Sequence, residues 1–231
     1  MTETYTTEGE LADARTLEQE AERFQAERDV HLGAYHEGED HDHTLTNTGM
    51  SNEKLGMWVF LGSECLLFGG LISTFLLYKT NNLAGGPVPR DLYDIELTSI
   101  SSFVLLMSSL TMVLGVSAIQ RGEEARMRLW LITTAVLGSV FISGQVYEFQ
   151  VFVEEGMGFT TNAASSAFFA LTGFHGVHVT LGIVMLLSVV VLSVAGRVPR
   201  ARAEAVEIVG LYWHFVDVVW VLIFTIVYLI P

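Results

Sequence analysis

The sequence predicts an all-α, polytopic membrane helix bundle with five transmembrane helices and a soluble, acidic N-terminal tail. Of the 231 residues, 51% are hydrophobic and only 16% are charged, whereas a soluble domain usually carries about 25% charged residues. The apolar runs are continuous, while the strands of a membrane barrel alternate between apolar and polar residues. The runs are therefore expected to be helices.

Residues 1–53 are expected to form an acidic cytoplasmic extension. Fourteen of the 26 acidic residues lie within the first 54 residues, and no apolar run does. The segment lacks the basic start and early apolar stretch of a secretory signal, and it is too acidic for a transit peptide. His36–His43 could bind a divalent cation, although it lacks the fixed spacing of a structured site. Clustered Lys and Arg are missing, so nucleic-acid binding is excluded.

Residues 54–231 are expected to form the five-helix transmembrane domain. A bilayer core of about 30 Å needs roughly 20 helical residues, and five apolar segments meet that length. The predicted spans are Leu55–Tyr78, Thr98–Ile119, Met127–Tyr147, Ala163–Ala195 and Ile208–Ile230.

The basic residues near the spans predict the orientation, because cytoplasmic connections are enriched in Lys and Arg. One side receives Lys54, Arg121, Arg126, Arg128, Arg197, Arg200 and Arg202, while the other receives only Lys79 and Arg90. The N-terminus is therefore expected in the cytoplasm and the C-terminus outside.

Glu64 is placed near the middle of the bilayer. It lies nine residues into the first span, at a depth of about 14 Å. An acidic residue there costs about 2.5–3.5 kcal/mol, so it should face protein, a polar cavity or a lipid headgroup. Two interpretations stay open: a carboxyl group involved in proton traffic or subunit contact, or a neutral one bonded to a neighbouring helix.

The intramembrane histidines are too few and too poorly placed for a bis-histidine haem site. His175 and His178 share a face of the fourth span, and they are expected to be hydrogen-bonded structural residues rather than metal ligands. His214 and Asp217 are also three residues apart, so they could form a self-contained pair on the last span. No metal site is expected.

Other polar and small residues have more ordinary explanations. Trp213 and Trp220 are expected to pack against neighbouring helices. Gln145 and Glu148 would close the third span, with Glu148 reaching water as an interfacial anchor. Small residues leave helix faces that permit close approach; they are Gly56, Gly62, Gly69, Gly70, Ser73, Ser108 and Gly115.

Four stretches resemble subunit III of the haem-copper oxidases, in its five-helix form. They are KLGMWVFLGSECLLF from Lys54, QVYEF from Gln145, FFALTGFHGVHVTLG from Phe168 and LYWHFVDVVW from Leu211. The resemblance covers nearly everything from residue 54 to the end, whereas the first 53 residues match no pattern of the family.

The resemblance implies a non-redox subunit of a proton-pumping respiratory terminal oxidase in a prokaryotic plasma membrane. Its partners would be oxidase subunits I and II, with haems and copper in those partners and none in this chain. The subunit would bind structural phospholipid, and membership of a respiratory supercomplex is compatible with the resemblance. The subunit would support subunit I through lipid binding, oxygen access and sustained proton uptake.

Carried over by motif, the proton-linked polar residues are Glu64, His175, His178, His214 and Asp217. The lipid or subunit contacts are Trp58, Trp213, Gln145 and Glu148. The chain lacks the first two helices of longer family members. In the longer members those two helices form one wall of a cleft that binds lipid. Here that wall would come from an extended subunit I.

Several alternatives stay open. TGFHG at Thr172–Gly176 together with Glu64 favours a cytochrome c oxidase over a quinol oxidase, and a homologue associated with nitric oxide reductase is a further alternative. A proton-coupled carrier that uses Glu64 and the histidines as a relay is disfavoured, because the sequence has no internal repeat. The electron donor, haem types, lipid identity and role of the tail are not specified by the sequence.

Overall fold

The computed structural model describes residues 23, 51–79, 95–196 and 203–230. Within them it contains five helices that are long and apolar enough to cross a membrane. These are α2 (Asn52–Lys79), α3 (Ile95–Gln120), α4 (Glu124–Glu154), α5 (Ala163–Val194) and α6 (Ala203–Phe224), which continues as a π-helical turn, η3 (Thr225–Leu229). The prediction of an all-helical, five-span membrane domain is confirmed for this part of the chain. Most of the acidic extension, including His36–His43, and the segment Arg197–Arg202 lie outside the described residues.

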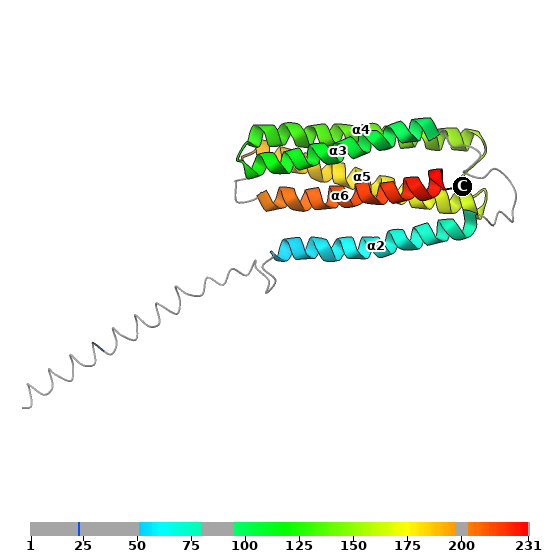
Figure 1. The fold of residues 1–231 in the computed structure, drawn as a ribbon, viewed down its shortest axis with the longest axis horizontal. Coiled ribbons are helices and arrows are strands. Elements are labelled where there is room, and N and C mark those ends of the chain that lie inside the picture. The colour runs from blue at the N-terminus through cyan, green and yellow to red at the C-terminus, as the bar shows by residue number, and fades with distance from the viewer. Residues whose placement is uncertain (1–22, 24–50, 80–94, 197–202, 231) are drawn as a thin grey trace, which may run out of the picture. The chain divides into compact units, whose positions relative to one another are not determined.

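The helices run side by side, in alternating directions along the chain (Figure 1). At one end, Lys54 Nζ of α2 lies 2.9 Å from Glu207 Oε2 of α6. At the other end, Lys79 Nζ donates to the carbonyl oxygen of Ile226 at 3.0 Å. The two ends of α2 therefore meet the two ends of the last helix, and both helices run in the same direction.

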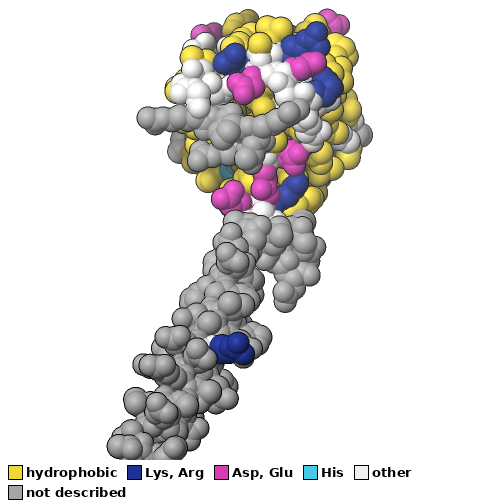
Figure 2. All heavy atoms as spheres, turned by 90° about the vertical axis from the view of Figure 1, so that its left-hand side faces the viewer, with side chains coloured by type: hydrophobic (Ala, Val, Ile, Leu, Met, Phe, Trp, Pro, Cys, Tyr) yellow, Lys and Arg dark blue, Asp and Glu magenta, His cyan; other side chains and the backbone are white. Residues whose placement is uncertain are grey.

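The surface of the bundle fits a membrane. Charged side chains gather at the end that Figure 2 shows, while hydrophobic side chains cover the flanks. Each of the five helices is apolar on nearly all sides, which is typical of helices that cross lipid. The chain is an integral membrane protein.

Trp213 lies at the centre of the packing. A Cβ atom added at Gly138 of α4 would lie 2.6 Å from the Trp213 ring, and one added at Gly182 of α5 would lie 2.8 Å from it. The indole N–H donates to Ser108 Oγ of α3 at 3.0 Å. The prediction of a lipid or subunit contact for Trp213 is wrong, because the two glycines make room for its ring inside the bundle and Ser108 satisfies its N–H.

Helix α2 is the most loosely attached of the five. It packs against α5 and α6, and only Leu61, Phe68 and Phe75, spaced seven residues apart, are buried. On another side of α2, a line of exposed residues comprises Val59, Gly62, Leu66, Gly69 and Ser73; we call this line the bare face of α2.

The bare face contains part of the small-residue pattern seen in the sequence. A Cβ atom added at Gly62 or Gly69 would meet nothing within 4 Å, and the same holds for Gly56 and Gly70. Close approach within this chain occurs at Gly115, which the sequence pattern included, and at Gly138, Gly182 and Gly210. The small residues of α2 are therefore available to a surface outside the chain.

Replacing Gly182 by Ala is expected to destabilise the protein by about 1–3 kcal/mol, because the added methyl group overlaps the Trp213 ring. The matched control is Gly173→Ala on the same helix, where a Cβ atom meets nothing within 4 Å. The control should be neutral or slightly stabilising, since Ala favours helix over Gly. Thermal unfolding of the purified protein compares the two, and equal melting temperatures would contradict this packing.

Candidate functional site

Glu64 of α2 and His178 of α5 form a hydrogen-bonded pair. The Glu64 Oε2 and His178 Nε2 atoms are 3.1 Å apart, and both side chains are largely buried. His178 Nδ1 lies 2.7 Å from the carbonyl oxygen of Phe174. Because a carbonyl only accepts, Nδ1 must carry a hydrogen and donate. The pair then shares one further proton, held either by the Glu64 carboxyl group or by His178 Nε2.

The surroundings of this pair are mostly aromatic. The Phe68 ring meets the His178 ring edge-on with centroids 5.0 Å apart, and Tyr212 donates its hydroxyl hydrogen to the His178 carbonyl oxygen at 3.0 Å. Of the two interpretations of Glu64, a bond to a neighbouring helix describes the contact in the structure.

His175 differs from His178 although the two lie one turn apart. Its ring is fully buried and stacks on Trp220 with centroids 4.9 Å apart, while Phe141 meets it edge-on. Neither ring nitrogen has a hydrogen-bond partner in the described part of the chain. The expectation of a hydrogen-bonded histidine is therefore wrong for His175, because aromatic rings occupy the positions that a polar partner would take.

No group of three or more His, Cys, Asp or Glu side chains that could hold a metal ion occurs among the described residues. Cys65, the single cysteine of the chain, is free and exposed on α2.

Glu148 is the centre of a second polar cluster. Its carboxylate accepts hydrogen bonds of 3.0 Å each from Thr98 of α3, Gln145 of α4 and Tyr228 of η3. Only 4% of Glu148 is exposed. The prediction of an interfacial anchor that reaches water is wrong, since α4 continues to Glu154 and buries Glu148 against α3 and η3.

His214 and Asp217 do not satisfy one another. His214 Nδ1 is 2.6 Å from Ser109 Oγ of α3. One oxygen of the Asp217 carboxyl group, Oδ1, is buried without a hydrogen-bond partner in the described residues. The prediction of a self-contained pair on one helix is therefore wrong, because His214 bonds to a serine of another helix instead.

One of the predicted contact residues reaches the surface, and another lines a groove. Trp58 is 51% exposed on α2. Gln145, although buried, lines an apolar groove of about 340 Å³ between α4 and α5, together with Gly173 and Gly176.

Hydroxyl groups of α3 were missed as site residues. Thr98, Ser102, Ser108 and Ser109 each bond a polar side chain of another helix, namely Glu148, Trp220, Trp213 and His214 in that order. A single serine in an apolar run carries little information. The concentration of Ser and Thr in one span was the signal that could have found them.

Replacing Tyr228 by Phe is expected to lower stability by about 1–3 kcal/mol, because the buried Glu148 carboxylate loses one of its donors. Tyr147→Phe is the control, since Tyr147 lies next to Glu148 in the chain but is exposed. Chemical or thermal denaturation of both variants in detergent gives the difference. A Tyr228→Phe protein as stable as the control would show that this bond is unimportant.

Comparison with known proteins identifies one family. The profile of the family described as Cytochrome c oxidase subunit III matches residues 5–230. The match takes in most of the acidic extension, whereas the motif resemblance starts only at residue 54.

Curated relatives carry two kinds of name. The chain is 39% identical over 178 residues to Cytochrome c oxidase subunit 3 of Bacillus sp. (strain PS3), covering 77% of this chain and 86% of the relative. It is 42% identical over 176 residues to Quinol oxidase subunit 3 of Bacillus subtilis (strain 168), covering 76% and 85%. It is 40% identical over 179 residues to Cytochrome c oxidase subunit 3 of Alkalihalophilus pseudofirmus, covering 77% and 86%.

The five apolar helices, the motifs that carry Glu64, His178 and Asp217, and the match along nearly the whole chain agree with one another. The chain belongs to the cytochrome c oxidase subunit III family of the haem-copper oxidases.

Proposed function

We propose that this chain is the non-redox subunit III of a proton-pumping haem-copper oxidase in a prokaryotic plasma membrane, with its N-terminus in the cytoplasm. In this role it supports subunit I through lipid binding, oxygen access and sustained proton uptake. The observation that carries the proposal is the bare face of α2, which leaves a membrane-embedded surface for another subunit.

The bare face suits contact with helices of a partner subunit. Its two glycines, Gly62 and Gly69, leave open space where side chains would stand. In lipid, helices associate largely through close packing at small residues rather than through the hydrophobic effect. We assign this face to helices of subunit I.

The groove between α4 and α5 is proposed to hold a phospholipid chain. It is apolar and opens between Val146 and Val177 on the outside of the bundle. Gly173, one of its lining residues, leaves open space on the α5 side. Trp58 on α2 is proposed as a further lipid or subunit contact because it is half exposed at membrane depth.

The Glu64–His178 pair is proposed to exchange its shared proton during turnover. A proton can move between a carboxyl group and an imidazole without changing the net charge of the pair. The pair lies at membrane depth, between α2 and α5. It lies on the side of α2 that faces α5, together with the buried Leu61 and Phe68.

The electron donor has two candidates. The TGFHG motif with Glu64 favours cytochrome c, and relatives named Cytochrome c oxidase subunit 3 support it. A relative named Quinol oxidase subunit 3 is equally similar. In this proposal the electron donor does not bind to this chain, so the partner subunits determine which donor is used.

The proposal predicts that the tagged chain, solubilised gently from its own membrane, copurifies with haem-bearing polypeptides. The visible spectrum of the complex should show reduced haem bands, and separated subunits should place them outside this chain. Consumption of oxygen with reduced cytochrome c or with quinol then identifies the donor. A single purified chain that carries haem itself would refute the proposed role.

Gly62→Leu is expected to weaken association with the haem-bearing partner by about tenfold or more, because a large side chain overpacks a close helix contact. Gly56→Leu is the control, since it lies on the same helix outside the bare face and has equally open surroundings. Both variants should insert normally. The ratio of haem to chain after purification measures association, and an unchanged ratio for Gly62→Leu would contradict the assignment of this face.

A further inference from the structure

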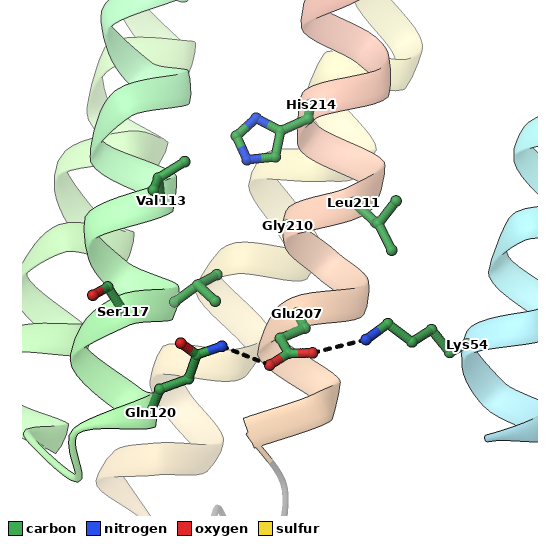
Figure 3. Close-up of a pocket in the computed structure, with 9 residues that line it drawn as sticks. Lys54, Val113, Ser117, Gln120, Glu207, Gly210, Leu211 and His214 are labelled. Atoms are coloured by element: carbon green, nitrogen blue, oxygen red, sulfur yellow. Dashed lines mark hydrogen bonds and ion pairs between the residues drawn. The ribbon is translucent and has the colours of Figure 1, made fainter. Parts of the chain in front are cut away.

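An open cavity of about 450 Å³ lies between α2, α3 and α6 (Figure 3). Its walls are mainly apolar and include Val113 of α3 and Leu211 of α6. At one end the Glu207 carboxylate accepts from Lys54 Nζ at 2.9 Å and from Gln120 Nε2 at 2.8 Å. We call the cavity the α6 groove, and the three bonded side chains at its end the mouth.

The two charged side chains of the mouth neutralise each other. Lys54 and Glu207 form an ion pair, and Gln120 bonds the other carboxylate oxygen. A phosphate group placed here would meet the Glu207 carboxylate as well as the Lys54 ammonium group, so repulsion offsets the attraction. The mouth therefore favours a neutral ligand over the phosphate of a phospholipid.

His214 places a hydrogen-bonding atom inside the α6 groove. It lies seven residues beyond Glu207 on α6, which is about 10 Å along the helix axis. Its ring projects toward α3, with one nitrogen turned toward the mouth (Figure 3). Nδ1 is 2.6 Å from Ser109 Oγ, whereas Nε2 has no hydrogen-bond partner among the described residues. A ligand in the groove would therefore meet Nε2.

The position of this nitrogen favours a ring that carries oxygen atoms over a plain hydrocarbon chain. A polar group that is taken out of water without gaining a hydrogen bond raises the free energy. An acyl chain offers no hydrogen bond at the depth of His214, whereas an uncharged ring with oxygen substituents can enter hydrocarbon and still supply one. The volume of the groove also lies in the usual range for small-molecule sites, roughly 300–1,000 Å³.

The bond between Ser109 and His214 lets Nε2 act either as a donor or as an acceptor. When the Ser109 hydroxyl group donates to Nδ1, the imidazole hydrogen is on Nε2, which then donates to a ligand. When Nδ1 carries the hydrogen and donates to Ser109 Oγ, Nε2 accepts from a ligand. The imidazole is neutral in both arrangements. The same atom can therefore bind a carbonyl oxygen or a hydroxyl group.

We propose that the α6 groove binds an isoprenoid quinone and its reduced form, the quinol. The quinone carbonyl oxygen accepts from His214 Nε2, and the quinol hydroxyl group donates to the same atom in the other tautomer. The isoprenoid tail lies against the apolar wall that includes Val113 and Leu211. Binding involves no electron transfer by this chain, so the site is independent of the electron donor of the oxidase.

An azido-quinone with a short isoprenoid tail tests the site in the purified oxidase complex. Illumination attaches the probe, and mass spectrometry of peptides from this chain alone shows where it was bound, so that quinone sites of other subunits do not interfere. We expect saturable labelling of α3 and α6 around Val113 and Leu211. The control probe is an alkyl diazirine of similar length, which should label the exposed helix faces without enrichment at the groove.

His214→Leu is expected to raise the half-saturating concentration of the azido-quinone about fivefold, because one hydrogen bond is lost. Val113→Phe should raise it about tenfold or more, because the added ring fills the groove. The matched control is Val140→Phe on α4, since Val140 is 52% exposed and Val113 is 50% exposed. The ratio of haem to chain verifies that each variant is assembled.

Unlabelled quinone and quinol should both displace the probe, at concentrations within about tenfold of each other. The physical reason is that Nε2 can donate to one form and accept from the other. Competition by only one of the two forms would contradict the proposed exchange of tautomers at His214.

Two further results would overturn the proposal. One is enrichment of the alkyl probe at the groove, with displacement by phospholipid but not by quinone, which would mean that an acyl chain occupies it. The other is an unchanged half-saturating concentration in both His214→Leu and Val113→Phe, which would place the quinone elsewhere. Neither result bears on the proposed role as subunit III, because the haem content of the complex is measured separately.

Discussion

The lack of water inside a bilayer is the constraint on which this structure depends. Each polar group at membrane depth must find a partner within the protein or raise the cost of insertion. In this chain the hydroxyl groups of α3 meet much of that need, since they bond Glu148, Trp213, Trp220 and His214. These bonds tie α4, α6 and η3 to α3 and fix the depth at which each helix packs.

Helix α2 is not among the helices that these α3 hydroxyl groups bond. Its strongest polar contacts with the other helices are the Lys54–Glu207 ion pair near one end and the Glu64–His178 bond near the middle. Its apolar contact is the narrow row of Leu61, Phe68 and Phe75. Four helices thus form a core held together by bonds within the chain, while the fifth presents an exposed face that we assign to another subunit.

The sequence predicted the helices well because a continuous apolar run of membrane length can form few structures other than a transmembrane helix. It placed Glu148 wrongly because hydropathy ends a span at a charge, whereas three donors from other segments allow α4 to continue past it. It correctly predicted that Trp213 packs against neighbouring helices, whereas the lipid or subunit contact carried over by motif is wrong, because Gly138 and Gly182 on two other helices make room for the ring inside the bundle. Ser109 was missed since a hydroxyl group gains importance only from what it meets in three dimensions.

The central claim is that this chain is completed by another subunit along the bare face of α2. The structure of the purified oxidase, determined by electron cryo-microscopy, is the most direct test. Helices of a haem-bearing subunit are expected within van der Waals contact of Gly62 and Gly69. Density for bulk lipid along the whole of that face would contradict it.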